Sequence, residues 1–173
     1  MEVTGISIAA VIAAGGNHTC ARLTDYTVKC WGYNGGGQLG DGSQANRSTP
    51  VAVSGLTNAA ALAAGGGHTC AVISPAVTYG TVKCWGQRGW GGTGTGQLGD
   101  GITTNTSSST PVDVSGISTA DTLTAGSAHT CARLTSGSVK CWGDDSQGQL
   151  GDGRASDVNG NPLAATPITV VGF

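Results

Sequence analysis

Six cysteines and three histidines recur along the chain in a fixed order, and their types and spacing suit the chemistry of a site. The cysteines fall into three pairs, which are Cys20 with Cys30, Cys70 with Cys84, and Cys131 with Cys141. A histidine stands two residues before the first cysteine of each pair, at His18, His68 and His129. On an extended strand such a histidine and cysteine project from the same face. Two chemistries use this pattern, which are a disulfide within each pair or a zinc ion held by one histidine and two cysteines.

The spacing favours disulfides over zinc. If a three-residue loop centred on Asp25 or Ser136 joins two strands, the two cysteines lie directly opposite each other, at a Cα separation of about 4.5 to 5.5 Å that a disulfide can bridge. The zinc alternative has three ligands and lacks the short CxxC spacing of most structural sites. We therefore predict one cross-strand disulfide per pair and no metal. The oxidising compartment that this requires is extracellular or periplasmic, and an export signal is not part of this sequence.

No other residues form a recognisable catalytic set. The three histidines stand in the same position relative to their cysteine pairs, each within one of three repeats of the sequence. We therefore predict that all three are structural and make hydrogen bonds between repeats or within turns. The aspartates stand in turn contexts, and no nucleophile is paired with a base. The run of Asp157, Asn159 and Asn161 alternates as calcium ligands do, but the bidentate glutamate of such loops is missing. The chain is therefore predicted to have no enzymatic activity and no cofactor.

The cysteines and histidines are positioned by three repeats that fill the chain. AAGGNHTCARL at 13–23 returns as AAGGGHTCAVI at 63–73 and TAGSAHTCARL at 124–134, and each is followed by VKCWG, GQLGDG and a TPxxV segment. The repeats are predicted to span 3–52, 53–113 and 114–169, and 170–173 begins a fourth in the same phase. We interpret residues 1–173 as a single repeat domain.

Each repeat is predicted to be four short strands. Glycine accounts for 31 of the 173 residues and charged residues for 10%, which is typical of turn-rich β-structure. An apolar run, HTCARL, VKCWG and the TPxxV segment are separated by turn residues, which is the pattern of a β-propeller blade. Gly137 suits the left-handed last position of a three-residue hairpin loop, and Tyr26 holds that position in the first repeat. The tryptophans of the KCWG segments, Trp31, Trp85 and Trp142, are predicted to pack between blades.

The pattern GGxHTCAL, a short hairpin, CWGxNxxGQLGDG and PVxV resembles the regulator of chromosome condensation repeat family, in a disulfide-containing form like that of secreted bacterial propellers. The resemblance implies an all-β, seven-bladed propeller fold. Three four-stranded blades would form an open arc unless oligomerisation completes them. The family's nucleotide exchange on a small nuclear GTPase and its chromatin docking would imply a regulatory function, and a bacterial branch inhibits β-lactamases. This chain lacks the basic tail of the nuclear members, and no inhibitory motif can be matched.

The second repeat departs most from the pattern, through the extensions SPAVTYG at 74–80 and QRGWGGTGT at 87–95. Their residues Tyr79, Arg88 and Trp90 are of the kinds that anchor interfaces, so we predict a partner-binding patch there. The alternative is that both extensions pack on their own blade. A net charge of −2 with eight Lys and Arg gives no electrostatic basis for nucleic-acid binding. No apolar run is long enough for a membrane helix.

These observations predict a non-catalytic propeller module for protein binding or self-assembly in an extracellular setting. Its partners would be further copies of the chain, as a ring or a filament, or another protein. The alternatives are a regulator or inhibitor of a partner enzyme or GTPase, and an excised or engineered fragment of a larger propeller. An exposed strand edge at each end of a three-blade arc favours association.

Overall fold

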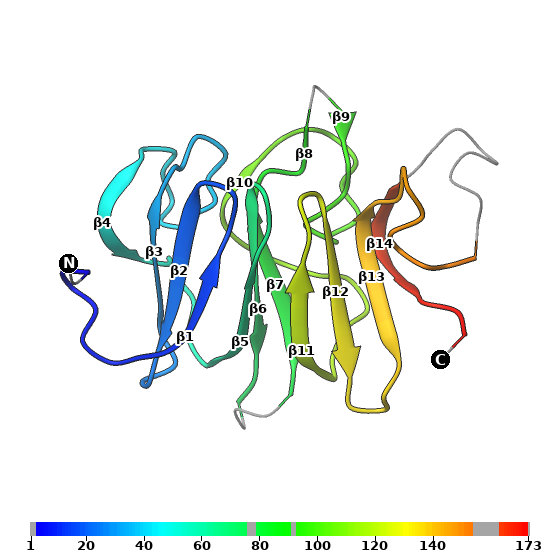
Figure 1. Cartoon of the computed structure of the whole chain (residues 1–173), viewed down its shortest axis with the longest axis horizontal. Coiled ribbons are helices and arrows are strands. Elements are labelled where there is room, and N and C mark those ends of the chain that lie inside the picture. Colours follow the sequence, from blue (N-terminus) through cyan, green and yellow to red (C-terminus); the bar gives the residue numbers. More distant parts are fainter. Residues whose placement is uncertain (1–2, 76–78, 91–92, 154–162, 173) are drawn as a thin grey trace.

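The computed structural model of the chain describes residues 3–75, 79–90, 93–153 and 163–172. These residues contain three four-stranded antiparallel sheets, which we call blades 1, 2 and 3 (Figure 1). Blade 1 consists of β1 (Ala9–Ala14), β2 (His18–Leu23), β3 (Val28–Gly32) and β4 (Arg47–Ala52). Blade 2 consists of β5 (Ala59–Ala64), β6 (His68–Ile73), β7 (Thr81–Gly86) and β10 (Ser108–Asp113). Blade 3 consists of β11 (Ala120–Ala125), β12 (His129–Leu134), β13 (Val139–Asp144) and β14 (Leu163–Thr169).

The blades stand side by side in chain order and form an open arc (Figure 1). The first strands β1, β5 and β11 lie next to one another, and the other strands of each blade follow in sequence order away from them. A two-stranded ribbon of β8 (Gly89–Trp90) and β9 (Thr93–Gly94) projects from the loop of blade 2. The prediction of four-stranded, all-β blades in an open arc is confirmed.

The outer strand of each blade carries the proline of the TPxxV segment, at Pro50, Pro111 and Pro167. Proline cannot donate a backbone hydrogen bond, so within sheets it is confined to edge strands or bulges. Each of these strands lies at an edge of its sheet, and its pairing with the neighbouring strand is irregular near the proline. The fourth strand can therefore carry the proline, because no further strand of its sheet pairs with its outer side.

The hairpin that joins the second and third strands has the loop that the sequence predicts. Gly137 has φ 88° and Tyr26 has φ 64°, so both occupy the left-handed position. The backbone N–H groups of Leu23 and Leu134 donate to the carbonyls of Thr27 and Ser138 and close the two loops. This loop sets the register that places the cysteines opposite each other.

Hydrophobic cores lie between the blades. One joins Val28, Leu39 and Val53 of blade 1 and the segment that follows it to Leu62 and Trp85 of blade 2. The core between blades 2 and 3 is built from equivalent residues of the next two repeats, including Val82, Leu98, Val114, Leu123 and Trp142. Each blade therefore has a leading face, toward the blade before it, and a trailing face, toward the blade after it.

Candidate functional site

Three disulfides join the second and third strands within the blades. Cys20 and Cys30 are direct partners in the register of β2 and β3, with an S–S distance of 2.08 Å and a Cα–Cα distance of 4.0 Å. The pairs Cys70–Cys84 and Cys131–Cys141 have the same arrangement, with S–S distances of 2.12 and 2.08 Å. The sulfur atoms are thus bonded to one another and cannot act as thiolate ligands. Among the described residues, no group of three His, Cys, Asp or Glu is placed to hold a metal ion.

The histidines of blades 1 and 2 bond to a threonine of the following blade. His18 Nε2 lies 2.8 Å from Thr69 Oγ1, and His68 Nε2 lies 2.7 Å from Thr130 Oγ1. Thr69 Oγ1 also donates to the Gln38 carbonyl at 3.0 Å, so its proton is used there and His18 Nε2–H must be the donor to Thr69. Nδ1 of His18 is then unprotonated, and it is buried without a hydrogen-bond partner. His18 is therefore held as a neutral ring.

Burial accounts for the charge state of both histidines. Desolvation lowers the pKa of His18 to about 4. It lowers the pKa of His68 to about 3, with a further contribution from repulsion by His18 and His129. A Cβ built on Gly15 would lie 2.3 Å from His18 Cε1. The glycine three residues before the histidine is therefore needed in each repeat to make room for the ring. These rings are buried parts of the interblade contact, which does not suit exchange of protons with a substrate.

A tryptophan forms the second polar contact of each interface between blades. Trp85 Nε1 donates to the Gln38 carbonyl of blade 1 at 3.0 Å, and Trp142 Nε1 donates to the Gln97 carbonyl of blade 2 at 3.0 Å. Both tryptophans are fully buried. The glutamine of GQLGDG is thus part of the interface, a role that the sequence reasoning missed although its recurrence in every repeat was the available signal.

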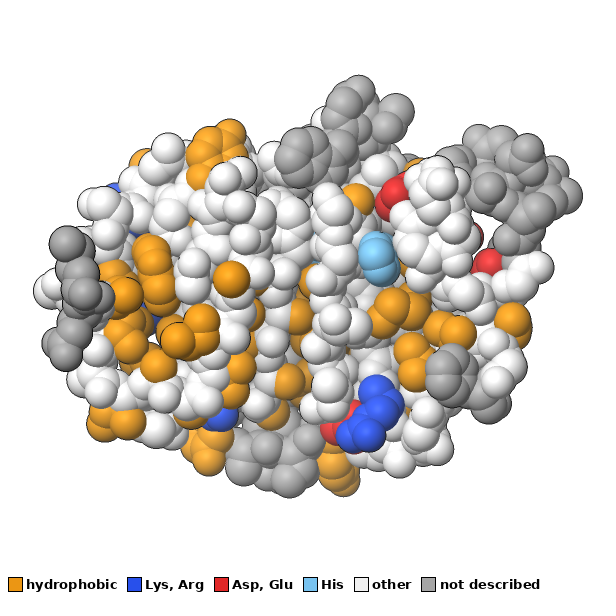
Figure 2. Space-filling model, viewed as in Figure 1, with side chains coloured by type: hydrophobic (Ala, Val, Ile, Leu, Met, Phe, Trp, Pro, Cys, Tyr) orange, Lys and Arg blue, Asp and Glu red, His pale blue; other side chains and the backbone are white. Residues whose placement is uncertain are grey.

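The leading face of blade 1 has the same residues but no blade against it. Ile12 is 66% exposed, whereas Leu62 and Leu123 at the equivalent positions are 8% and 9% exposed. Thr19 and Trp31 are half-buried, whereas their equivalents in the other two blades are buried. In Figure 2, hydrophobic side chains gather over the strands of blade 1. The exposed apolar area follows from the open end of the arc.

The trailing face of blade 3 carries the other half of the interface. His129 and Gln149 are half-buried, whereas their equivalents in blades 1 and 2 are buried. Both line a hollow of about 450 Å³, whose other lining residues are Ser127, Ala128 and Asp144 of blade 3 and Thr95 of the blade 2 loop. Among the described residues, no threonine of a following blade faces His129. The two outer faces are therefore complementary halves of one type of contact.

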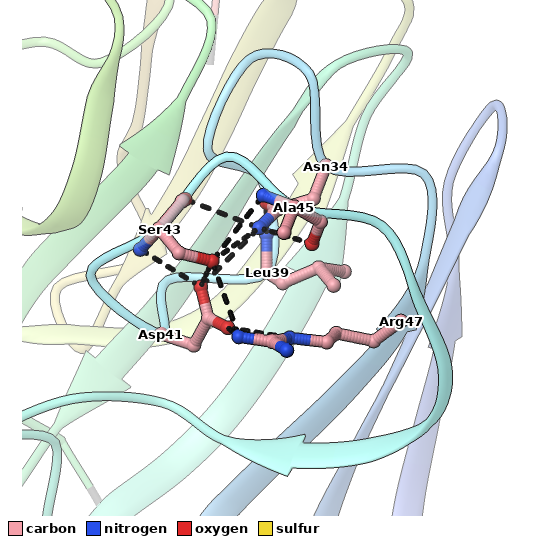
Figure 3. Close-up of polar contacts among 6 residues, drawn as sticks. All are labelled: Asn34, Leu39, Asp41, Ser43, Ala45 and Arg47. Atoms are coloured by element: carbon pink, nitrogen blue, oxygen red, sulfur yellow. Dashed lines mark hydrogen bonds and ion pairs between the residues drawn. The ribbon is translucent and has the colours of Figure 1, made fainter.

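A polar network holds the loop between β3 and β4 in blade 1 (Figure 3). Asn34 donates to Asp41 and accepts the Leu39 N–H at 2.9 Å, while Asp41 also accepts from Ser43 and Arg47. Burial raises the pKa of Asp41, but the hydrogen bonds outweigh it and leave the pKa below its ordinary value. The network fixes the backbone of GQLGDG, whose Gln38 carbonyl receives the tryptophan.

The three residues predicted to bind a partner are not brought together. Tyr79 is 50% exposed and precedes β7, whereas Arg88 and Trp90 follow it, so they lie at opposite ends of blade 2. Arg88 is buried and forms an ion pair with Asp100. In blade 1 the equivalent residues, Asn34 and Asp41, are joined by a hydrogen bond. The buried guanidinium supports its own loop, and the partner-binding patch at Tyr79, Arg88 and Trp90 stays a prediction. The Trp90 side chain and the run of 157–161 lie outside what the structure describes.

Sequence models of the regulator of chromosome condensation (RCC1) repeat match this chain at residues 28–72 and, for a second model of the repeat, at 10–38 and 121–149. The ultraviolet-B receptor UVR8 of Arabidopsis thaliana is 30% identical over an alignment of 152 residues, and the match covers 85% of this chain and 32% of the receptor.

Solved structures show the same fold. Yeast RCC1 (Prp20), in a structure with Kap60 bound, superposes with a TM-score of 0.77 at 19% identity, over 97% of this chain and 38% of that one. Human WBSCR16 superposes with a TM-score of 0.77 at 22% identity, over 99% of this chain and 39% of that one. The chain thus spans less than two fifths of the length of these relatives. With three blades that match RCC1 propeller blades, the chain belongs to the regulator of chromosome condensation repeat family.

Proposed function

We propose that this chain is a non-catalytic protein-binding module that works outside the reducing cytosol, in an extracellular or periplasmic setting. The observation that carries the proposal is the exposure of Ile12 at a position where the two following blades bury a leucine. Contiguous apolar area on a soluble protein marks an interaction surface. The binding surfaces are the leading face of blade 1 and the trailing face of blade 3.

The repeat architecture supports a binding role without catalysis. His18 and His68 are neutral, buried and engaged in contacts between blades. The continuous cores between neighbouring blades also support our interpretation of the three repeats as one domain. Such a domain presents a rigid surface and needs no moving parts to bind a partner.

The disulfides support an oxidising compartment. The described residues contain three disulfides and no free cysteine. Disulfides persist in secreted and periplasmic proteins and are rare in the cytosol, where thiols are kept reduced. Within the described residues, no helix has the length and apolar character needed to cross a membrane.

Relatives with this fold bind proteins. Yeast RCC1 (Prp20) has been solved in complex with Kap60, and Prp20p of Saccharomyces cerevisiae binds Gsp1p and histones. The chain covers 38% and 39% of these proteins at 19% and 20% identity, so the class of activity, protein binding, is carried over and the individual partners are not.

Photo-crosslinking from the proposed surface tests this function. A benzoyl-phenylalanine introduced at position 12, in the host that produces the chain, is expected to give adducts with a protein that mass spectrometry identifies. The same group at position 25, in the exposed hairpin turn, is the control and should give none. Equal labelling from both positions, or no adduct from position 12, would overturn the proposal. Free cysteines in the non-reduced protein from that host would overturn the assigned compartment.

A further inference from the structure

The two interfaces inside the arc are built in the same way, so each defines what a blade needs from its neighbour. The trailing face supplies a histidine Nε2, and the leading face of the next blade supplies a threonine hydroxyl. The trailing face also supplies a glutamine carbonyl, which a tryptophan Nε1 of the leading face reaches. Backbone contacts repeat too, because Gly42 and Gly101 donate to the carbonyls of Ser109 and Ala165 on the next outer strand, at 3.0 and 2.9 Å. A blade of this chain is thus specific for another blade with the same residues.

The outer faces hold the unused halves of this set. Thr19, Trp31 and Ile12 lie on the leading face of blade 1 and are more exposed than their equivalents in blades 2 and 3. His129 and Gln149 of blade 3 are the equivalents of the histidines and glutamines that form the trailing faces of blades 1 and 2, and both are half-buried. For the two polar contacts described above, each outer face thus carries, among the described residues, the partner that the other one lacks.

We infer that the partner of these faces is a second copy of this chain, bound head to tail. This inference rests on the proposed function, and it names the partner. In the contact, His129 of one copy bonds to Thr19 of the other, and Trp31 of the second copy donates to the Gln149 carbonyl of the first. Ile12 of the second copy then packs where Leu62 and Leu123 pack inside the arc.

Association of identical faces would not satisfy these groups. The indole N–H is a donor without acceptor capacity, so two leading faces would bring together two tryptophans that both lack a carbonyl. The head-to-tail contact satisfies both partners with the geometry that the chain already uses twice. Such a contact is heterologous, and it closes into a ring or continues as an open chain. Two copies supply six blades, within the range of about four to eight found in closed propellers.

The decisive experiment mixes two variants that are each blocked at one end. Ile12→Arg places a charge on the leading face of blade 1, and His129→Arg places one on the trailing face of blade 3. Light scattering of the non-reduced wild-type protein is expected to show assemblies of two or more chains, whether of fixed mass or growing with concentration. Each variant alone should associate at least about tenfold more weakly. An equimolar mixture should form a complex of two chains and nothing larger, because one intact contact remains.

Ile102→Arg is the matched control, since Ile102 is exposed on a loop of blade 2 away from both outer faces, and it should associate like the wild type. Circular dichroism and the absence of free thiols check that each variant is folded. A wild-type protein that remains monomeric at millimolar concentration would overturn the inference. So would recovery of no complex in the mixture, since that result indicates non-specific adhesion or a contact between identical faces.

The two proposals fail separately. A monomeric chain that still gives adducts with a different protein from position 12 would overturn the second copy as partner and leave the binding function standing. A monomeric chain that gives no adduct would overturn both. Adducts of the chain with itself, joined from position 12 to blade 3, would support both.

Discussion

Replacing Thr69 by valine removes one hydroxyl from the interface between blades 1 and 2 and keeps the shape of the side chain. Thr69 is fully buried, and its hydroxyl accepts from His18 Nε2 and donates to the Gln38 carbonyl. The Gln38 carbonyl still accepts a hydrogen bond from Trp85 Nε1 at 3.0 Å. The one buried group that loses its partner is therefore the Nε2–H of His18. Leaving one buried polar group unpaired costs about 1 to 3 kcal/mol. We expect the free energy of unfolding to fall by that amount.

The assay is equilibrium unfolding in urea with the disulfides intact, at the lowest protein concentration that gives a signal. Thermal unfolding is a second measurement, in which a loss of 1 to 3 kcal/mol corresponds, for a chain of this size, to a decrease in Tm of roughly 3 to 9 °C. Thr19→Val is the matched control, because Thr19 is the equivalent residue on the open leading face of blade 1. It should change the unfolding free energy by less than about 0.5 kcal/mol.

A double-mutant cycle isolates the cause. In a His18→Ala background the unpaired donor no longer exists, so Thr69→Val should cost clearly less than it does in the wild type. The reasoning is refuted if Thr69→Val is neutral, if Thr19→Val costs as much, or if the cost of Thr69→Val is unchanged in the His18→Ala background.

Four further predictions follow from the same structure. Reduction of the three disulfides should lower stability by about 2 to 3 kcal/mol for each bridge, measured as the urea midpoint with and without reductant; an unchanged midpoint would contradict this. Gly137→Ala should cost about 1 kcal/mol in thermal unfolding through its φ of 88° alone, since no atom lies within 4 Å of the added Cβ. The pKa values of His18 and His68, about 4 and about 3, lie below the unfolded value of 6.5, so stability is full above pH 6.5 and decreases as pH falls toward 3; urea titrations that are flat from pH 6.5 to 4 would refute this. Arg88→Met removes a guanidinium that is only 6% exposed and should cost about 3 kcal/mol or more in urea unfolding, whereas Arg47→Met removes one that is 41% exposed and leaves Asp41 its hydrogen bonds from Asn34 and Ser43, so it should cost less than about 1 kcal/mol.

The repeat pattern was sufficient to predict the strands and the disulfides, because both depend on local geometry. A left-handed residue at the end of a three-residue loop fixes the hairpin register, and the register places Cys20 opposite Cys30. The same holds for Gly137 and the third pair of cysteines. Contacts of this kind span about ten residues and are visible in a repeated sequence.

The candidate site was less accessible to sequence reasoning, because its contacts join different repeats. The HTC motif indicated that His18 would bond near a turn or between blades, but not that its acceptor is Thr69, 51 residues away. The prediction of a partner-binding patch at Tyr79, Arg88 and Trp90 rested on residue type alone. Arg88 is instead buried, since a carboxylate at Asp100 lies where the arginine can pair with it.

The sequence by itself determined the all-β blade, its four strands and the three cross-strand disulfides, since these follow from local periodicity, turn residues and cysteine spacing, and the resemblance of its repeat motifs indicated the family. Only the tertiary structure decided which faces are covered. Equivalent residues such as Ile12, Leu62 and Leu123 are alike in the sequence, but their exposure is set by whether another blade packs against them. The physical reason is that burial depends on position in the arc, which equivalent residues of the repeats do not share.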